Sequence, residues 1–199
     1  SRTITVTPAA DQHGSATITV TVSDGTTLAS DTFLLTVTSV NDPPTITDIG
    51  PQVVDEDTST GTIAFTVGDP DTALAGLLVT ATSDNATLVP PASIALGGAD
   101  ASRTIAILPA ANASGSATIT VTVTDGTTPV SDTFTLTVNA VNDVPSITAI
   151  ADQTIDEDTS SPALAFTVGD VETAAASLAT SVSASNAVLF PPGSMVLGG

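Results

Sequence analysis

The sequence predicts an all-β protein built from tandem Greek-key β-sandwiches of about seven strands each. Three observations predict this fold class. Blocks of sequence recur at an offset of 101 residues, apolar and polar residues alternate with a period of two, and the alternating segments are bounded by Gly, Pro or Asp. Strict alternation is typical of half-buried strands, whereas a surface helix gives a period near 3.6.

The repeat fixes the expected domain organisation. Residues 41–44 (Asn-Asp-Pro-Pro) return at 142–145 as Asn-Asp-Val-Pro, and Asp-Glu-Asp-Thr at residues 55–58 returns unchanged at 156–159. Internal similarity at a fixed period indicates a repeat architecture. We therefore expect three parts: residues 1–44 as the C-terminal part of a preceding repeat, residues 45–145 as one complete repeat, and residues 146–199 as the N-terminal part of a following repeat.

The strands of the complete repeat follow from its alternation. Apolar residues at 117, 119, 121 and 123 alternate with threonines, and the same pattern recurs over residues 133–138. Asp125-Gly126 lies between these two strands, where glycine relieves the backbone of a tight turn. Further strands are expected at residues 45–54, 63–67, 77–82, 93–96 and 104–108. About seven strands in roughly 100 residues are typical of an immunoglobulin-like sandwich.

The composition limits the core and the partners. Hydrophobic residues make up 41% of the chain, yet Cys, Trp and Tyr are absent and the five Phe are the only aromatic residues, so the core must be aliphatic. Twenty-one acidic residues against two basic ones give a net charge of −19, which argues against binding nucleic acid or an anionic membrane. Divalent cations suit that charge. No apolar run approaches the roughly 18 residues of a membrane span, so none is expected in this segment.

The acidic residues gather where strands are expected to end. They stand in Asp55-Glu56-Asp57, Asp69-Pro70-Asp71 and Asp125-Gly126, and beside Asn in Asn41-Asp42 and Asn142-Asp143. Calcium takes about six to eight oxygen ligands, and loops that converge at one end of a sandwich are able to supply them. Asp and Asn are also common in turns because their side chains bond the local backbone, so turn chemistry is an alternative interpretation of each motif.

Residues 122–129, the strand at 134–138 and the linker at 141–145 together resemble the end of a cadherin repeat. Glu56 resembles that family's early calcium-binding glutamate, and Asp69-Pro70-Asp71 resembles its D-x-D loop. The chain is most similar to the bacterial cadherin-like and immunoglobulin-like tandem repeats of very large adhesin-type surface proteins. The resemblance implies an extracellular or cell-surface location, a role in cell adhesion and bound Ca²⁺.

The resemblance also implies two sets of calcium ligands, one for each junction between repeats. The first comprises Asn41, Asp42, Asp69, Asp71 and Asp125. The second comprises Glu56, Asn142, Asp143, Asp170 and Glu172. The chain departs from the cadherin linker at Ser39 and Ala140 and at Pro43 and Val144, and residues 108–111 hold no acid where cadherins have an acidic loop. These departures imply fewer or weaker ions than in cadherins.

No catalytic or cofactor-binding constellation stands out, so we do not expect an enzyme. His13 is the only histidine, and no Tyr or Trp is present to line a sugar cleft beside the paired acids Asp69 and Asp71. We expect a structural segment of an extracellular, calcium-stiffened stalk, adhesin or filament that assembles head to tail. The alternative is a β-sandwich module that binds a ligand or a glycan. The sequence names no adhesion ligand.

The two incomplete repeats are complementary. Residues 1–44 supply the last three strands of a sandwich, the first of them at the start of the chain, and residues 146–199 supply the first four or so, so neither part buries its apolar face alone. We expect residues 1–44 of one copy to pack against residues 146–199 of a neighbouring copy. A long covalent array and separate subunits both remain open, with the covalent array favoured because only three residues of the repeat lack counterparts between Gly199 and the next Ser1.

Overall fold

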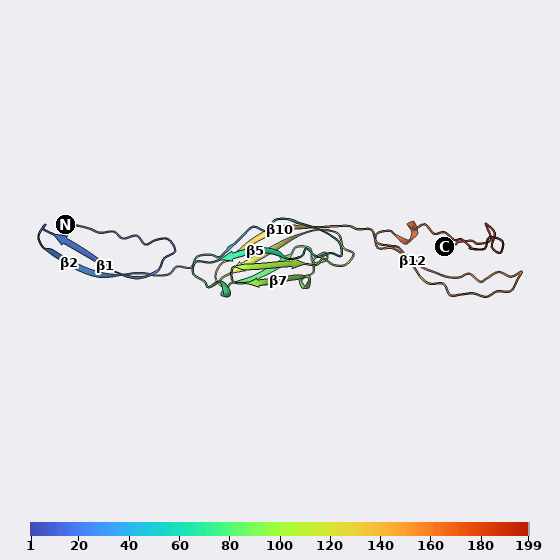
Figure 1. Ribbon diagram of the computed structural model, residues 1–199, viewed down its shortest axis with the longest axis horizontal. Coiled ribbons are helices and arrows are strands. Elements are labelled where there is room, and N and C mark those ends of the chain that lie inside the picture. The colour runs from blue at the N-terminus through green and yellow to red at the C-terminus, as the bar shows by residue number, and fades with distance from the viewer. Residues whose placement is uncertain (199) are drawn as a thin grey trace. The chain divides into compact units, whose positions relative to one another are not determined.

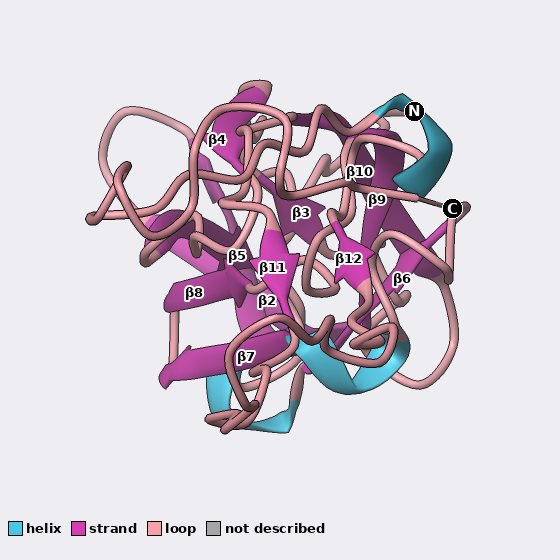
Figure 2. Cartoon of the chain, turned by 90° about the vertical axis from the view of Figure 1, so that its right-hand side faces the viewer, coloured by secondary structure: helices cyan, strands magenta, loops and turns pink. Residues whose placement is uncertain are grey.

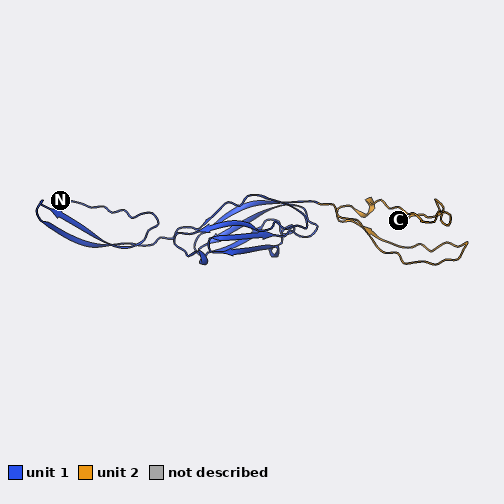
Figure 3. Cartoon of the chain, in the orientation of Figure 1, with its two compact units in different colours: residues 1–140 blue, residues 141–199 orange. Residues whose placement is uncertain are grey.

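A computed structural model describes residues 1–198 of the chain, which divides into two compact units, Ser1–Ala140 and Val141–Gly199 (Figure 3). Its regular structure is mostly β-strand, as predicted (Figure 1). The helices described are single 3-10 turns: η1 (Leu74–Gly76), η2 (Pro91–Ser93) and η3 (Ala175–Ser177). No helix among residues 1–198 has the length and apolar character needed to cross a membrane.

The first unit contains a complete β-sandwich. One sheet has the strand order β4-β10-β9-β6 and the other has the order β3-β5-β8-β7. Strands β3 to β6 alternate between the two sheets, whereas the consecutive pairs β7–β8 and β9–β10 each stay within one sheet, as in an immunoglobulin-like Greek key, which confirms the predicted fold class. Figure 2 shows the same chain coloured by secondary structure, with strands as its main regular elements. The strands are β3 (Thr45–Ile46), β4 (Gln52–Asp55), β5 (Ile63–Gly68), β6 (Leu78–Ser83), β7 (Ile94–Ala99), β8 (Ser102–Ile107), β9 (Gly115–Thr124) and β10 (Pro129–Asn139).

The first predicted strand, residues 45–54, is divided between the two sheets. β3 pairs antiparallel with β5, whereas β4 pairs parallel with β10 in the opposite sheet. Between them, the Ile49 amide donates to Asp132 Oδ2 at 2.9 Å and the Ile49 side chain is buried. Gly50-Pro51 follows, and proline cannot donate to a β-ladder. The complete sandwich therefore has eight strands instead of about seven.

The core between the sheets is aliphatic, as the composition predicts. Alternate residues of β9 and β10 point into it, and the threonines between them face outward. Two phenylalanines are the only aromatic residues in this core. The buried apolar residues are Ile49, Phe65, Val67, Leu77, Leu88, Val89, Ile105, Ile107, Ala117, Ile119, Val121, Val123, Phe134, Leu136 and Val138.

The N-terminal residues of the first unit form a hairpin of β1 (Gly14–Ser23) and β2 (Leu28–Val37). Ile18 pairs with Phe33 in the same register as Ile119 with Phe134. The expected third strand, at residues 1–6, does not form. Its equivalent β8 is hydrogen-bonded on both sides, to β5 and β7, whereas residues 1–6 belong to no described sheet.

The second unit is less regular than its sequence predicts. It contains β11 (Ser146–Ile147) paired with β12 (Val168–Gly169), and the 3-10 turn η3. About four strands were expected there, and the remaining ones do not form within residues 141–198. A strand needs a hydrogen-bonded neighbour, and in the complete repeat much of that pairing comes from β8, β9 and β10. Gly199, on which the expected continuity with Ser1 depends, lies outside the described residues.

Arg103 is held by two backbone carbonyls of a neighbouring turn. Its Nη2 donates to the Leu74 carbonyl at 2.9 Å and to the Leu77 carbonyl at 3.5 Å. These carbonyls lie at the start of η1 and directly after it, so the guanidinium fastens this turn to β8. The equivalent Arg2 is exposed.

The repeated valines offer a matched test of the core. Val121 is fully buried, whereas its equivalent Val20 is 44% exposed. Val121→Ala should lower the free energy of unfolding by about 2 kcal/mol, because two buried carbons are lost and a cavity is left. Val20→Ala should change it by less than about 0.5 kcal/mol in dilute protein. Urea denaturation of the two variants checks this, and equal effects would contradict the assignment of the core.

Candidate functional site

The first predicted ligand set lies in three loops of the first unit. Asn41 and Asp42 stand in the linker between β2 and β3, Asp69 and Asp71 follow β5, and Asp125 begins the turn between β9 and β10. The sandwich places these loops at one end because β5 and β9 both finish there. Hydrogen bonds connect the linker to both loops.

Asp125 bonds its own turn and the linker at once. Its Oδ1 accepts hydrogen bonds from the amides of Thr127 at 2.6 Å and Thr128 at 2.7 Å, and its Oδ2 accepts one from Asn41 Nδ2 at 2.7 Å. The bonds from Thr128, Asn41 and Thr127 hold the pKa of this carboxyl below its usual value, because they favour the charged form. Asp24, at the equivalent position, makes the same kind of turn.

Asp69 and Asp71 form the second loop. Asp69 Oδ1 accepts from the amides of Asp71 at 2.8 Å and Thr72 at 2.6 Å, which closes the turn. Asp71 Oδ2 accepts from the Asp42 amide at 2.8 Å, so this acid fastens the linker. Asp69 Oδ2 is buried and has no hydrogen-bond partner among the described residues. One carboxylate oxygen is therefore available for a further ligand.

Asp42 is the acid of this set whose ionised form is disfavoured by its surroundings. Partial burial, followed by the negative charges of Asp11, Asp71 and Asp69, raises the pKa of the Asp42 carboxyl. Burial and nearby like charge both disfavour the ionised form of an acid. The surroundings of Asp42 in the first junction therefore disfavour its ionised carboxylate.

Asp11 is a residue of this site that the sequence motifs did not reveal. It lies in a turn with a positive φ of 57°, and its charge acts on Asp42 across 31 residues of sequence. Asp11, His13, Asp42 and Asp71 are among the residues that line a pocket of about 290 Å³. The available signal was alignment of the repeats, since residues 7–11 match residues 108–112 and carry an acid where the complete repeat has Asn112.

The second unit repeats part of this arrangement. Asp170 Oδ1 accepts from the amides of Glu172 at 3.2 Å and Thr173 at 2.7 Å. Glu172 Oε2 accepts from the Asp143 amide at 3.0 Å, as Asp71 does from Asp42. Asn142 Nδ2 donates to the Asp143 carbonyl at 2.6 Å. We call the loops at residues 69–71, 125–128 and 170–172 the rim loops. In both repeats the linker is therefore hydrogen-bonded to the rim loop that contains the acid pair.

Glu56 lies in the first unit, directly after β4. It is the one charged residue counted among the buried residues of the described chain, with 6% of its surface exposed. Its amide donates to the Asn139 carbonyl at 2.9 Å, and Asn139 Nδ2 donates to Asp55 Oδ1 at 3.0 Å. Glu56 is therefore fixed at the end of the parallel β4–β10 pair.

The donors of the first junction fit a hard cation in kind, because carboxylate and amide oxygens are the ligands that calcium takes. The buried, unpartnered Asp69 Oδ2 also fits such a role. Within residues 1–198, however, no three His, Cys, Asp or Glu side chains are arranged as a metal site. Several of the carboxylate oxygens instead accept backbone hydrogen bonds, so metal binding stays a prediction.

No family model and no curated protein matches the chain. Among solved structures, the chain is similar to a chimeric titin Z1Z2 carrying a KLER peptide from decorin, with 19% identity over 51% of this chain and 99% of that one and a TM-score of 0.39. Titin M4 matches at 20% identity over 51% and 100%, with a TM-score of 0.39. Domains 4 and 5 of the S-layer protein SbsC match at 20% identity over 64% and 66%, with a TM-score of 0.41.

The opposite pKa shifts of Asp42 and Asp125 give opposite pH dependence. The raised pKa of Asp42 penalises folding at neutral pH, and this penalty disappears as the pH falls through the folded pKa towards 3.8. The lowered pKa of Asp125 stabilises the fold above pH 3.8, and this contribution disappears as the pH falls through the folded value. Without calcium at pH 7, Asp42→Asn should therefore raise the melting temperature and Asp125→Asn should lower it.

Thermal melts followed by circular dichroism from pH 3 to pH 7 check these signs. Asp48→Asn is the control, because Asp48 is an exposed acid outside the junction. A fall in melting temperature on Asp42→Asn at pH 7 would show that the linker carboxylate is not under net repulsion.

Proposed function

We propose that this chain is a structural segment of an extracellular or cell-surface stalk, adhesin or filament, in which calcium stiffens the linkers between successive β-sandwiches. The observation that supports this most is the attachment of the linker to two rim loops. Asn41 donates to Asp125, and the Asp42 amide donates to Asp71. A linker held in this way keeps a defined orientation at the start of the sandwich that follows it.

Calcium has a definite role at such a linker. Burial, and then the like charges of Asp11, Asp71 and Asp69, raise the pKa of Asp42 and so oppose bringing the ionised linker to the rim, and a divalent cation bound among these acids would offset both effects. Asp69 Oδ2 provides a buried acceptor beside the same loops. In this proposal Asp42, Asp69, Asp71 and Asp125 supply the carboxylates of the first junction, and Asn41 supplies an amide oxygen.

The repetition of the linker supports an array with regular junctions. The bond between Asp143 and Glu172 reproduces that between Asp42 and Asp71, so the second unit begins with the same attachment. Asn142 and Asp170 take the places of Asn41 and Asp69. Repeats joined in the same way at each linker extend head to tail.

The surface chemistry fits a structural and adhesive role better than a catalytic one. The net charge of −19 repels nucleic acid and anionic lipid, and it attracts divalent cations. Outward rows of threonine cover the β9–β10 face, where Thr122 and Ser131 bond each other at 2.8 Å. We assign the chain no catalytic role, and its adhesion ligand is unspecified.

Calcium should raise the melting temperature of the chain and narrow the range of linker orientations. Binding to the folded state alone stabilises it, and an affinity of about 10⁻⁴–10⁻³ M is expected for an extracellular calcium module. Differential scanning calorimetry and small-angle scattering at low protein concentration, with calcium and then with chelator, measure the two effects.

Asp69→Asn tests the ligand set without breaking the turn, because the amide oxygen can still accept the bonds from Asp71 and Thr72. The variant should lose part of the calcium-dependent rise in melting temperature. Asp48→Asn removes the same charge from an exposed position and should keep the full rise. If magnesium, calcium and chelator give the same melting temperature in the unmodified chain, the calcium proposal fails.

A further inference from the structure

Strand β6 is an edge strand of the complete sandwich and lacks the usual protection against pairing. The two sheet orders place β3, β4, β6 and β7 at the edges. β3 has only two residues, β4 ends in Asp55, and β7 contains Gly98 with a positive φ of 85°. β6 instead has six residues with no charge, glycine or proline. Because edge strands are normally blunted by charge, proline, distortion or short length, β6 is able to accept another strand.

The backbone of β6 directs alternate residues away from its own sheet. The Asp84 amide donates to the Thr118 carbonyl at 3.1 Å, and the Thr118 amide donates to Asp84 Oδ1 at 2.7 Å. Thr118 therefore turns its backbone groups toward β6, as do the alternate β9 residues that lie opposite the outward-facing residues of β6. The intervening residues of β6 direct their N–H and C=O groups to the free side, where no described strand lies. These residues are Val79, Ala81 and Ser83.

The side chains of β6 also suit a neighbour on this side. Val79 and Ala81 pack against the core but stay partly exposed, because the sheet ends beside them. The outward threonines of β6 are exposed. In the same sheet, Thr122 and Ser131 of two paired strands bond each other through their hydroxyls at 2.8 Å. A further strand of similar composition supplies both apolar cover and hydroxyl partners.

The charge of the chain favours one such strand. Two copies with a net charge of −19 repel each other, and the repulsion is least where neither surface carries charge. Residues 72–83, which include β6, contain no charged residue. We propose that β6 of one copy pairs antiparallel with β6 of a second copy of this chain, about a two-fold axis at Ala81. A two-fold interface requires a surface that is complementary to itself, and an uncharged antiparallel edge meets that requirement.

The axis at Ala81 gives the longest ladder that β6 allows. Ala81 lies opposite Ala81 of the second copy, and Val79 lies opposite Ser83 of the second copy. These are the residues whose backbone groups face the free side, so each pair is joined by hydrogen bonds. Moving the axis by one residue in either direction would place one of these residues opposite a position outside β6.

The same axis brings hydroxyls together on the outer face and keeps acids apart. Thr80 lies opposite Thr82 of the second copy, in a pair of the kind that stabilises sheets. Asp84, directly after β6, lies opposite Leu78 of the second copy, so no two acids face each other. The contact joins copies side by side, and its antiparallel strands make the two sandwiches point in opposite directions. It goes beyond the proposed function and does not depend on calcium.

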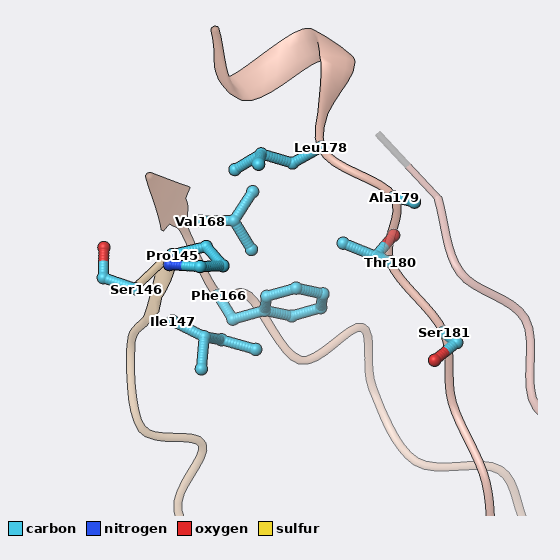
Figure 4. Close-up of a pocket in the computed structure, with 9 residues that line it drawn as sticks. All are labelled: Pro145, Ser146, Ile147, Phe166, Val168, Leu178, Ala179, Thr180 and Ser181. Carbon is cyan, nitrogen blue, oxygen red and sulfur yellow. The ribbon is translucent and has the colours of Figure 1, made fainter. Parts of the chain in front are cut away.

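The second unit repeats the uncharged segment. Residues 179–184 occupy the positions of β6 and again contain no charged residue, glycine or proline. Figure 4 shows Thr180 beside the same pocket as Phe166, and their equivalents Val79 and Phe65 share a pocket in the complete sandwich. Residues 179–184 form no strand in the described structure, so the proposal concerns β6.

Amide hydrogen exchange, followed by NMR in chelator, tests the edge directly. In dilute protein the amides of Val79, Ala81 and Ser83 should exchange quickly. When nine-tenths of the chain is dimeric, their exchange should be about tenfold slower, because only the monomer leaves these amides open. The amides of Thr80 and Thr82 bond β9 and should be protected at both concentrations. Exchange at the three edge amides that does not change with concentration would overturn the proposal.

Thr80→Asp tests the uncharged edge. In the dimer the two new acids lie diagonally across the strands, about 7–8 Å apart, where like charges repel. Sedimentation velocity should show a dimer of the unmodified chain at high concentration and association at least about tenfold weaker for Thr80→Asp. Thr135→Asp is the matched control, because Thr135 is an exposed threonine of the same sheet on the inner strand β10. Equal weakening by the two variants, or a monomer at every concentration, contradicts the pairing.

Disulfide cross-linking tests the register. The chain contains no cysteine, so Thr80→Cys in one preparation and Thr82→Cys in another should form a mixed disulfide on mild oxidation. The Cα atoms of this pair lie about 4.5 Å apart in the proposed ladder, which a disulfide spans. Thr80→Cys by itself should cross-link far less, because its two copies are diagonal. If Thr80→Cys by itself cross-links best, the axis lies at Thr80 and the assigned register is wrong.

A labelled peptide with the sequence of residues 77–84 distinguishes a second copy from a foreign strand. The peptide should bind the unmodified chain and compete with its dimerisation. Binding of the peptide to a chain that stays monomeric would assign the edge to a foreign strand and overturn pairing between copies. Because all these measurements are made in chelator, their failure leaves the calcium proposal standing, and absence of a calcium effect on melting leaves this contact standing.

Discussion

A β-strand has unsatisfied backbone groups and an open apolar face until other strands pack beside it and over it, and this requirement governs the whole chain. The same repeat appears here in satisfied and unsatisfied forms. Val121 is enclosed between two sheets, whereas Val20 in a nearly identical hairpin is not. Residues 1–6 have the alternation of β8 but form no strand in the described structure. Packing therefore decides whether the pattern becomes a sandwich.

The acids of the rim loops close their own turns, through Asp69 and Asp125, and also attach the linker, through Asp71 and Asp125. Asp125 closes its turn with Oδ1 and holds Asn41 with Oδ2. Asp69 closes a turn with Oδ1, and its Oδ2 is buried without a partner. Each of these carboxylates therefore closes its own turn with one oxygen and leaves the other oxygen for a group that is distant in sequence. The result is a concentration of negative charge around Asp42, which is the physical basis of the calcium proposal.

The sequence by itself determined the all-β class, the 101-residue repeat, the aliphatic core and the positions of most strands, because these depend on local alternation and on internal similarity. It also grouped the rim acids, since Asp69 and Asp125 each follow a strand. Only the tertiary structure divided residues 45–54 between two sheets, brought Asp11 near Asp42, and directed Arg103 to two carbonyls. These features depend on contacts between segments distant in sequence, and such contacts have no local periodic signature.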